Sequence, residues 1–202
     1  MSNLIPKTVF LDQDVVKMAK FLIGKKIITH IDGVRTSGII TETEAYRAPE
    51  DKGSHAYNNK RTERTQTFYM EGGHLYVYLC YGVHALTNII TGPEDVPHAV
   101  LLRAIEPIDG VEIMMQRRGK TDFNKTLTSG PGSLSVALGL NLAFNAYHFV
   151  EDPNQVSIEY TDQNIHDDQI VTTTRIGLES AGEWANMPWR FYLKDTKWVS
   201  KK

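Results

Sequence analysis

The sequence contains one cysteine, Cys80, and this scarcity excludes two ways of stabilising a fold. A single thiol cannot form an internal disulfide, which favours a reducing compartment. It also cannot supply a CxxC motif or a Cys/His zinc cluster. The chain does not need such cross-links, because 202 residues are enough to bury a sizeable core. We expect one domain over residues 1–202.

The chain also has no apolar segment of the kind that enters or crosses a membrane. Its N-terminus, MSNLIPKTVFLDQD, has no charged stretch followed by an apolar one, so it predicts no secretory signal. No apolar run approaches the roughly 20 residues that a membrane-spanning helix needs. We therefore expect a cytoplasmic protein that does not bind membranes.

An excess of positive charge is missing as well, since the formal net charge is −2. Proteins that bind nucleic-acid backbones usually carry a basic excess, so this balance argues against such a role. Locally, basic residues gather in NNKRTERT (58–65) and MMQRRGK (114–120), whereas acidic residues gather in 151–168. Each basic cluster is consistent with an ordinary solvated face, but the two together allow one positive surface.

The first part of the chain predicts a helix followed by a hairpin. Apolar residues recur at helical spacing over residues 11–23, with Asp12 or Asp14 as the cap. Two β-branched runs follow on either side of Asp32-Gly33, a dipeptide typical of hairpin turns. This part therefore predicts two adjacent antiparallel strands behind one helix.

The rest of the chain mixes strands and helices irregularly. Residues 74–91 predict two strands that turn near Gly82, and residues 98–107 predict a strand that is buried on both sides apart from Arg103. We expect helices opened by Pro107 and by Ser129. Because strands and helices do not alternate regularly, the chain predicts an α+β fold, with a largely antiparallel, curved sheet flanked by helices.

Glu44 is the first candidate for chemistry. It lies on the same face of a predicted strand as Glu42 and Tyr46. A buried carboxylate must be paired, or must hold a proton or water for a purpose. Two carboxylates roughly 7 Å apart can also share acid and base work at a sugar bond. The residues alone leave open that Glu44 is an ordinary charge on an exposed strand face.

Aromatic residues accompany this carboxylate. Tyr46, His55 and Tyr78 predict a flat aromatic box, which suits a planar heteroaromatic ligand. The alternative is that the tyrosines are half-buried strand residues and that His55 makes ordinary loop hydrogen bonds. Tyr81 differs, because it precedes Gly82 at the expected turn and is well placed to project outward.

The histidines raise the question of a metal site. His55, His74 and His84 could converge with Glu44, but their spacing matches no HExxH-type motif. We therefore expect no metal and no cofactor.

Six blocks of the sequence, in order and spacing, resemble the alkylpurine DNA glycosylases, also called 3-methyladenine DNA glycosylases of the alkyladenine type. The blocks span most of the chain and are far more specific together than any one motif. They are TETEAYRAPEDKGSHAY (41–57), LYVYLCYGVHALTNI (75–89), AVLLRAIEP (99–107), SGPGSL (129–134), TRIGLESAGEWANMPWRFY (174–192) and KWVS (197–200).

The resemblance implies a DNA glycosylase of base excision repair. Such an enzyme flips alkylated or deaminated purines, the class of 3-methyladenine, 7-methylguanine and hypoxanthine, and hydrolyses the N-glycosidic bond to leave an abasic site. We expect it to be monofunctional, because no lysine lies beside the proposed nucleophile position. The implied partner is double-stranded DNA containing damaged purines, bound by a monomer in the bacterial cytoplasm, on the nucleoid.

The resemblance also implies roles for single residues. Glu44 matches the carboxylate that deprotonates and positions the attacking water. Arg103 matches the arginine that helps to hold the water and Glu44. Tyr46, His55 and Tyr78 resemble the residues that enclose and stack on the flipped base. Glu42 is then expected to be structural.

Further positions match residues that contact DNA. Asn88 matches the residue that crowds the 2-amino group of guanine, and Tyr81 matches the side chain inserted into the space that the nucleotide vacates. That assignment makes the predicted hairpin a DNA-binding tip. Thr62 and Arg64 lie where the family contacts the backbone, and Lys60 belongs to the same loop.

Three positions depart from the family pattern. Lys60 stands where arginine is expected, Thr65 replaces a common asparagine, and Ser133 replaces a lysine. Lysine keeps the charge but loses the bidentate fork of arginine. The Ser133 hydroxyl and the nearby amides can still bind an anion at a helix N-terminus. We expect weaker or more salt-sensitive DNA binding than is usual in the family.

Two alternatives stay open. A hydrolase of free nucleosides would use the same pocket without an intercalating tip, so Tyr81 would matter little and binding would depend weakly on salt. A non-catalytic nucleic-acid-binding module would use the aromatic residues as a stacking platform, and Glu44 would be dispensable.

Overall fold

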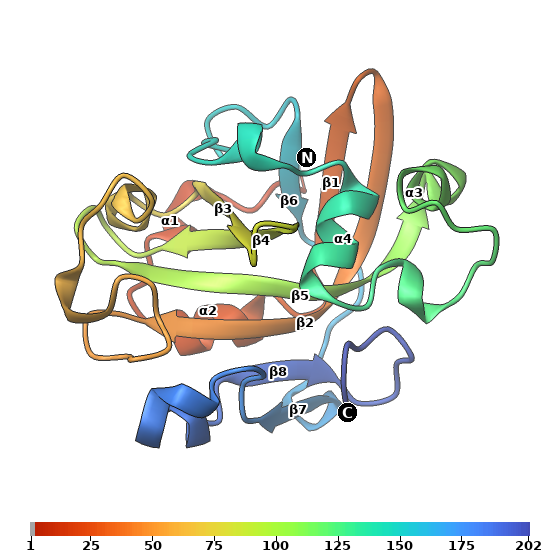
Figure 1. The fold of residues 1–202 in the computed structure, drawn as a ribbon. Coiled ribbons are helices and arrows are strands. Elements are labelled where there is room, and N and C mark those ends of the chain that lie inside the picture. The colour runs from red at the N-terminus through yellow and green to blue at the C-terminus, as the bar shows by residue number, and fades with distance from the viewer. Residues whose placement is uncertain (1–2) are drawn as a thin grey trace.

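One antiparallel sheet forms the centre of the computed structural model, which describes residues 3–202. The strands follow the order β3-β4-β5-β2-β1-β6, and β8 pairs with both β2 and β7. Figure 1 shows β2 and β5 lying side by side through the middle of the molecule. The strands are β1 (Lys26–Ile31), β2 (Val34–Arg47), β3 (Leu75–Cys80), β4 (His84–Thr91), β5 (His98–Asp109), β6 (Val156–Glu159), β7 (Ile170–Thr173) and β8 (Arg190–Leu193).

Short helices cover this sheet, so the predicted α+β class and largely antiparallel sheet are confirmed. Within residues 3–202 no helix is long and apolar enough to pass through a bilayer. The α-helices are α1 (Lys7–Phe10), α2 (Val15–Phe21), α3 (Val111–Arg117) and α4 (Pro131–Leu138). The 3-10 helices are η1 (Tyr57–Asn59), η2 (Gln66–Tyr69), η3 (Lys125–Leu127), η4 (Leu142–Phe144), η5 (Asp167–Gln169) and η6 (Glu179–Asn186).

The β1–β2 hairpin turns where the sequence predicts it. Asp32 and Gly33 both have positive φ angles, of 55° and 73°, as a two-residue turn between antiparallel strands requires. The predicted helix over 11–23 is shorter than expected, because α2 begins at Val15. Its N-cap is Asp14, whose carboxylate accepts the backbone N–H of Lys17.

Pro107 does not open a helix, so that prediction is wrong. It lies inside β5, opposite Gly38, where the β2–β5 register shifts. A strand tolerates proline at such an irregularity, because the missing N–H is not needed for the ladder. A Cβ on Gly38 would lie 2.7 Å from the carbonyl oxygen of Glu106, so only glycine allows this approach. The helix α3 follows Gly110 instead.

The helix expected to open at Ser129 exists, but Ser129 is not its cap. Gly130 is the N-cap, with a φ of 133°, and Pro131 occupies the first turn of α4. Ser129 instead forms an isolated bridge with Ala104 of β5. This bridge brings the start of α4 beside the strand that carries Arg103.

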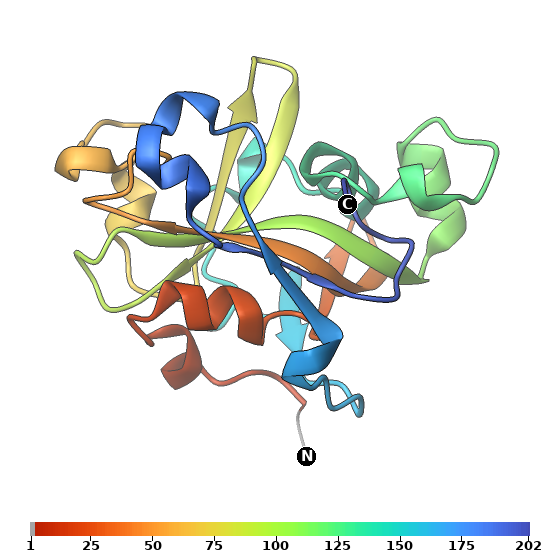
Figure 2. The same ribbon diagram turned by 90° about the horizontal axis from the view of Figure 1, so that it is seen from below.

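Shifts in the β2–β5 pairing register occur where β2 contributes residues to the candidate site. The register with β5 shifts on both sides of Glu42, and Arg103 falls between the paired residues Leu102 and Ala104. The same stretch of β2 pairs with β8, so Glu44 lies opposite Arg190. In Figure 2, α2 lies on one side of the β2–β5 pair, and the β3–β4 hairpin projects on the other. The site is on the hairpin side.

Candidate active site

A cavity of about 620 Å³ lies between the β3–β4 hairpin, the 53–68 loop and the segment that follows β7. Loops on three sides and the sheet below form its walls. Several residues with predicted roles line it together: Tyr46, His55, Arg64, Tyr78, Tyr81, Asn88 and Arg103. Glu44 is not among the lining residues, because its side chain lies behind Tyr46 and Arg103 with no exposed surface.

Three donors hold the Glu44 carboxylate. The Tyr46 hydroxyl and Nη1 of Arg103 donate to Oε2 over 2.9 and 3.1 Å, and the backbone N–H of Ile176 donates to Oε1 over 2.8 Å. A carboxylate offers about four acceptor positions, so roughly one remains, and it lies on Oε1. Burial, followed by the charge of Glu44, raises the pKa of Tyr46 well above its usual value. The hydroxyl therefore stays protonated and donates.

Glu42 and Arg103 form the support beneath Glu44. Glu42 accepts Nε of Arg103 at 3.0 Å, Nη1 of Arg190 at 2.8 Å, and both the backbone N–H and the hydroxyl of Ser200. Burial disfavours the Arg103 cation, but Glu44 and Glu42 outweigh that effect and raise its pKa. The strand expected to be buried apart from Arg103 therefore buries this side chain too, since its charge is balanced by two carboxylates.

Aromatic rings form one wall of the cavity. His55 lies edge-on to Tyr78, with ring centroids 4.6 Å apart, and Tyr76 stacks against Tyr78 at 5.3 Å. The Tyr76 hydroxyl lies 3.0 Å from Nδ1 of His55. Tyr46 faces the same cavity from β2. The three residues predicted to enclose a base therefore come together, and Tyr76 joins them.

His55 carries no charge at neutral pH. Burial, followed by the nearby charges of Arg64 and Lys60, lowers its pKa from 6.5 to about 4. A guanidinium only donates hydrogen bonds, so Nη2 of Arg64, 3.4 Å from Nε2, assigns the acceptor role to that nitrogen. The proton then lies on Nδ1, which donates to Tyr76. A neutral imidazole adds no positive charge of its own to that of the neighbouring Arg64 guanidinium.

Tyr81 occupies the tip of the β3–β4 hairpin, as predicted. It is 95% exposed, and both Tyr81 and Gly82 adopt left-handed φ angles. Val83, the next residue, is 72% exposed. Asn88 lies deeper, on β4, where its amide nitrogen donates to the carbonyl of Tyr76 over 3.1 Å. Asn88 thus forms part of the cavity floor, beneath the projecting tip.

The predicted backbone-contacting loop has a rigid frame. Thr65 is buried, and its hydroxyl donates to the carbonyl of Lys60 and accepts the backbone N–H of Thr62. Lys60, Thr62 and Arg64 all lie on the exposed side of this turn. Arg61 is different, because it pairs with Asp95. Threonine in place of the family's asparagine therefore maintains the turn.

Ser133, the other departure, lies in the first turn of α4. Its hydroxyl accepts Nη2 of Arg118 over 2.9 Å. Arg118 also donates to the carbonyl of Leu127. A guanidinium therefore stands near the position where the family carries a lysine charge.

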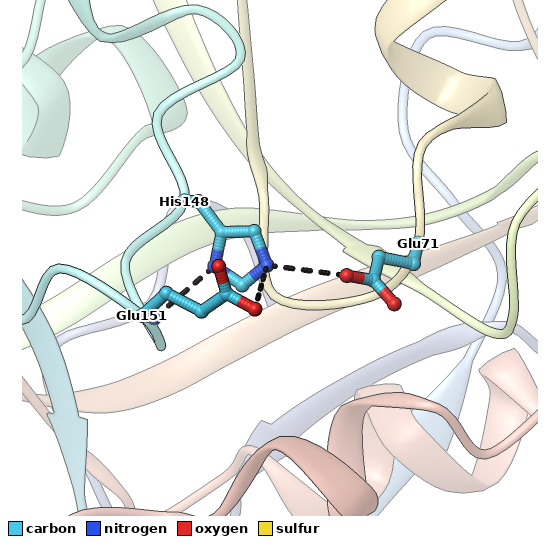
Figure 3. Close-up of side chains that lie close together, drawn as sticks. All are labelled: Glu71, His148 and Glu151. Atoms are coloured by element: carbon cyan, nitrogen blue, oxygen red, sulfur yellow. Dashed lines mark hydrogen bonds and ion pairs between the residues drawn. The ribbon is translucent and has the colours of Figure 1, made fainter.

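The histidines do not converge on Glu44. Among the described residues, the group with metal-ligand spacing is Glu71, His148 and Glu151, whose ligand atoms lie within 4.8 Å of one another. Figure 3 shows the two carboxylates reaching the imidazole from different loops. The Lys7 ammonium binds both carboxylates, at 2.6 and 2.8 Å, so a cation already compensates their charge. The His74 ring lies edge-on to His148, and neither residue lines the cavity.

Sequence reasoning gave no role to Arg175, Asp51 or the Ile176 amide. Arg175 and Asp51 form a buried bidentate pair, although 124 positions separate them in the chain. No local pattern reports such a distant contact. The one signal in the sequence was that residues 174–192 resemble the family as a block. That resemblance indicated that the segment matters but gave no role to its individual residues.

Comparison with known proteins identifies a family for this chain. The family model described as methylpurine-DNA glycosylase (MPG) matches residues 9–197. A Chlamydia abortus protein is 46% identical over 191 residues, covering 94% of this chain and 98% of its own length. A Bacillus cereus (strain G9842) protein is 42% identical over 199 residues, covering 96% and 97%. Both bear the name "Putative 3-methyladenine DNA glycosylase".

These matches cover nearly the whole chain, and the cavity, the buried carboxylate and the projecting tyrosine lie within the matched residues. The protein is a DNA glycosylase, a hydrolase of N-glycosyl bonds with a role in base excision repair. The chain belongs to the methylpurine-DNA glycosylase family.

Proposed function

We propose that the protein flips an alkylated or deaminated purine out of duplex DNA and hydrolyses its glycosidic bond, with Glu44 activating the water. The observation that carries this proposal is the position of Glu44. Its carboxylate is fully buried, is held by three donors and lies directly behind two residues of an aromatic cavity. A buried, fixed carboxylate beside a site for a flat ring suits removal of a base.

Access to the base requires flipping. A base inside the duplex stack cannot reach a cavity, and extruding it costs a few kcal/mol. Tyr81 fills the vacated space in this proposal, because it projects from the hairpin next to the cavity and is 95% exposed. Stacking on aromatic faces inside the cavity returns about 1–3 kcal/mol per base.

The cavity suits a purine that carries positive charge. Alkylation at N3 or N7 makes the base cationic, and the faces of Tyr46 and Tyr78 that Arg175 and Arg64 leave uncovered attract a cation. His55 does not oppose this attraction, since its pKa of about 4 keeps it neutral. We assign 3-methyladenine and 7-methylguanine to this class. Neutral hypoxanthine needs protonation at N7, and Asn88 disfavours normal guanine by crowding its 2-amino group.

Hydrolysis then proceeds at C1′. A cationic purine is a good leaving group, and its departure develops oxocarbenium character on the sugar. The Glu44 carboxylate stabilises that charge. The free acceptor position on Oε1 accepts a hydrogen bond from the attacking water and then takes its proton. Arg103 fixes Glu44 from below, since it bridges Glu44 to Glu42. The bond from C1′ to the base breaks, water adds at C1′, and an abasic site remains.

Strand cleavage is not part of this reaction. A lyase would need an amine to form a Schiff base with the abasic sugar. Among the described residues that line the cavity, none is a lysine. We therefore propose a monofunctional enzyme. Nicking of the product before alkali treatment, or an adduct trapped by borohydride, would contradict this.

We propose that the enzyme acts as a monomer. With relatives in Chlamydia and Bacillus, we place the enzyme in the bacterial cytoplasm, on the nucleoid. The exposure of Tyr81 favours duplex DNA over a free nucleoside, because a nucleoside hydrolase has no use for a projecting aromatic tip.

The test is a panel of duplexes, each with a single lesion, assayed for base release by wild type, Glu44→Gln and Glu106→Gln. Glu106 is an exposed carboxylate on β5 and is the matched control. We expect Glu44→Gln to bind the lesion duplex and to lose turnover, while Glu106→Gln stays active. A fully active Glu44→Gln would sink the role assigned to Glu44 and favour a stacking module.

A further inference from the structure

We propose that Arg175 and Asp51 form a positioning pair that aligns two of the three donors to Glu44. The inference rests on the catalytic role proposed for Glu44. Neither residue touches the reacting atoms, so their effect passes through the Ile176 amide and the Tyr46 ring.

The Arg175–Asp51 pair is a buried junction. Both Nη atoms of Arg175 bind the Asp51 carboxylate, at 2.5 and 2.8 Å, and neither side chain has exposed surface. The same guanidinium donates to the carbonyl of Ala45 at 2.9 Å and to that of Trp184 at 3.1 Å. One arginine therefore ties β2, the segment before η1 and the chain around η6 at fixed distances.

The Arg175–Asp51 junction fixes the position of the first donor to Glu44, the backbone N–H of Ile176. Ile176 is the next residue after Arg175, and its N–H donates to Oε1 of Glu44 over 2.8 Å. Thr174, on the other side, is held by Arg190, whose Nε donates to its carbonyl over 3.0 Å. With side-chain bonds at 174 and 175, the amide of residue 176 has little freedom to leave the carboxylate.

Arg175 also orients the second donor to Glu44, the Tyr46 hydroxyl, by packing against the Tyr46 ring. The guanidinium carbon of Arg175 lies 4.8 Å from the centroid of the Tyr46 ring, close enough for a cation–π contact. Tyr46 donates its hydroxyl to Oε2 of Glu44. Arg175 thus covers one face of the ring whose hydroxyl holds the second oxygen of the carboxylate.

Asp51 carries the junction to the opposite wall of the cavity. Its carboxylate accepts the backbone N–H of Gly53 at 2.9 Å, in the loop that leads to His55, and that of Arg47 at 3.2 Å, at the end of β2. The loop and the 174–178 segment pack so closely that a Cβ on Gly53 would lie 2.8 Å from Leu178 and 3.2 Å from Arg175. The pair therefore joins the wall that bears His55 to the amide that holds Glu44.

The test substitutes Arg175→Lys, which keeps the charge but removes the fork that binds Asp51, Ala45 and Trp184 together. Arg35→Lys is the matched control, because Arg35 also pairs with an aspartate, Asp109, near the far end of β5. Single-turnover base release and binding to an uncleavable abasic-analogue duplex are measured for both. The Ile176 amide resonance is followed by ¹⁵N–¹H NMR in the same variants.

We expect Arg175→Lys to slow single-turnover release roughly 10- to 100-fold, with duplex affinity changed less than about threefold. The Ile176 amide proton should move upfield, as we also expect when Glu44→Gln weakens the acceptor, while Arg35→Lys should change none of these. If Arg175→Lys does not fold, Gly53→Ala replaces it, because the added Cβ would crowd Asp51 Oδ1 at 3.1 Å and Arg175 Nη2 at 3.2 Å and should move the amide in the same direction.

Two results would overturn the proposal. One is an unchanged Ile176 amide in Arg175→Lys and Gly53→Ala. The other is a wild-type release rate in Arg175→Lys when Glu44→Gln is inactive. A failure of the proposed function looks different, because Glu44→Gln itself would then remain active while the amide shifts persist.

Discussion

The Tyr46 hydroxyl lies 2.9 Å from Oε2 of Glu44, two positions along the same strand. The residue that lines the base cavity is therefore also a donor to the carboxylate behind it. In the proposed mechanism, binding of a base against Tyr46 and orientation of Glu44 are consequently linked through one side chain.

Tyr46→Phe separates these two tasks, because it keeps the ring and removes the hydroxyl. A hydrogen bond to a charged group contributes about 1.5–3 kcal/mol, so we expect single-turnover release to fall roughly 10- to 100-fold. Affinity for an uncleavable lesion duplex should change little. Equal losses in binding and rate would show that the hydroxyl contacts the base rather than Glu44.

Tyr81→Ala should weaken base capture without weakening the fold. The side chain is 95% exposed, so its removal costs almost no buried surface, and the melting temperature should stay within about 1 °C. Release from duplex should slow by tenfold or more, with a smaller effect on single-stranded substrate. The control is Ile108→Ala, because Ile108 is also an exposed apolar residue but lies near the C-terminal end of β5. Unchanged activity of Tyr81→Ala would favour the nucleoside hydrolase.

Lys60 and Arg61 are neighbours that should behave differently. Lys60 is exposed, whereas Arg61 binds Asp95 and lies 3.7 Å above the Tyr69 ring. Lys60→Ala should reduce the slope of log K against log salt by about 0.9, the value of one phosphate contact. Arg61→Ala should leave the slope nearly unchanged. An unaltered slope in Lys60→Ala would remove Lys60 from the DNA contacts.

His55 should make the protein less stable in mild acid. Burial and nearby cations lower its pKa from 6.5 to about 4. Between pH 6.5 and about pH 4, His55 is therefore protonated in the unfolded chain but largely neutral in the folded chain. The free energy of unfolding therefore falls as the pH drops through this window, by roughly 3 kcal/mol at its lower end.

Melting temperatures of wild type and His55→Gln between pH 7 and pH 4 measure this contribution. The dependence should be flatter in His55→Gln, whereas substitution of the exposed His30 by glutamine should leave the wild-type slope. Identical slopes in all three proteins would mean that His55 titrates normally. Above pH 5 the release rate should show no step due to His55.

Local features of the sequence were sufficient for much of the fold. Asp32-Gly33 predicts its hairpin because a two-residue turn has strict backbone requirements. Glu44 and Tyr46 share a face because strand side chains alternate, and Tyr81 projects because the turn begins beside it.

Features that depend on distant contacts were not predicted. Pro107 resembles a helix start in sequence, but the close approach of Gly38 makes it part of a strand. Arg103 was expected to be the exposed position of its strand, yet two glutamates from β2 neutralise it inside the protein. The pairing of Asp51 with Arg175 spans most of the chain, so no periodicity reports it.

Most donors to the two buried glutamates lie far beyond them in the sequence. Glu42 and Glu44 lie in the first quarter, but the Ile176 amide, Arg190 and Ser200 follow much later. During synthesis on the ribosome, β2 therefore emerges long before most of the groups that hold its carboxylates. A growing chain cannot complete the hydrogen bonds of Glu42 until Ser200 has left the exit tunnel.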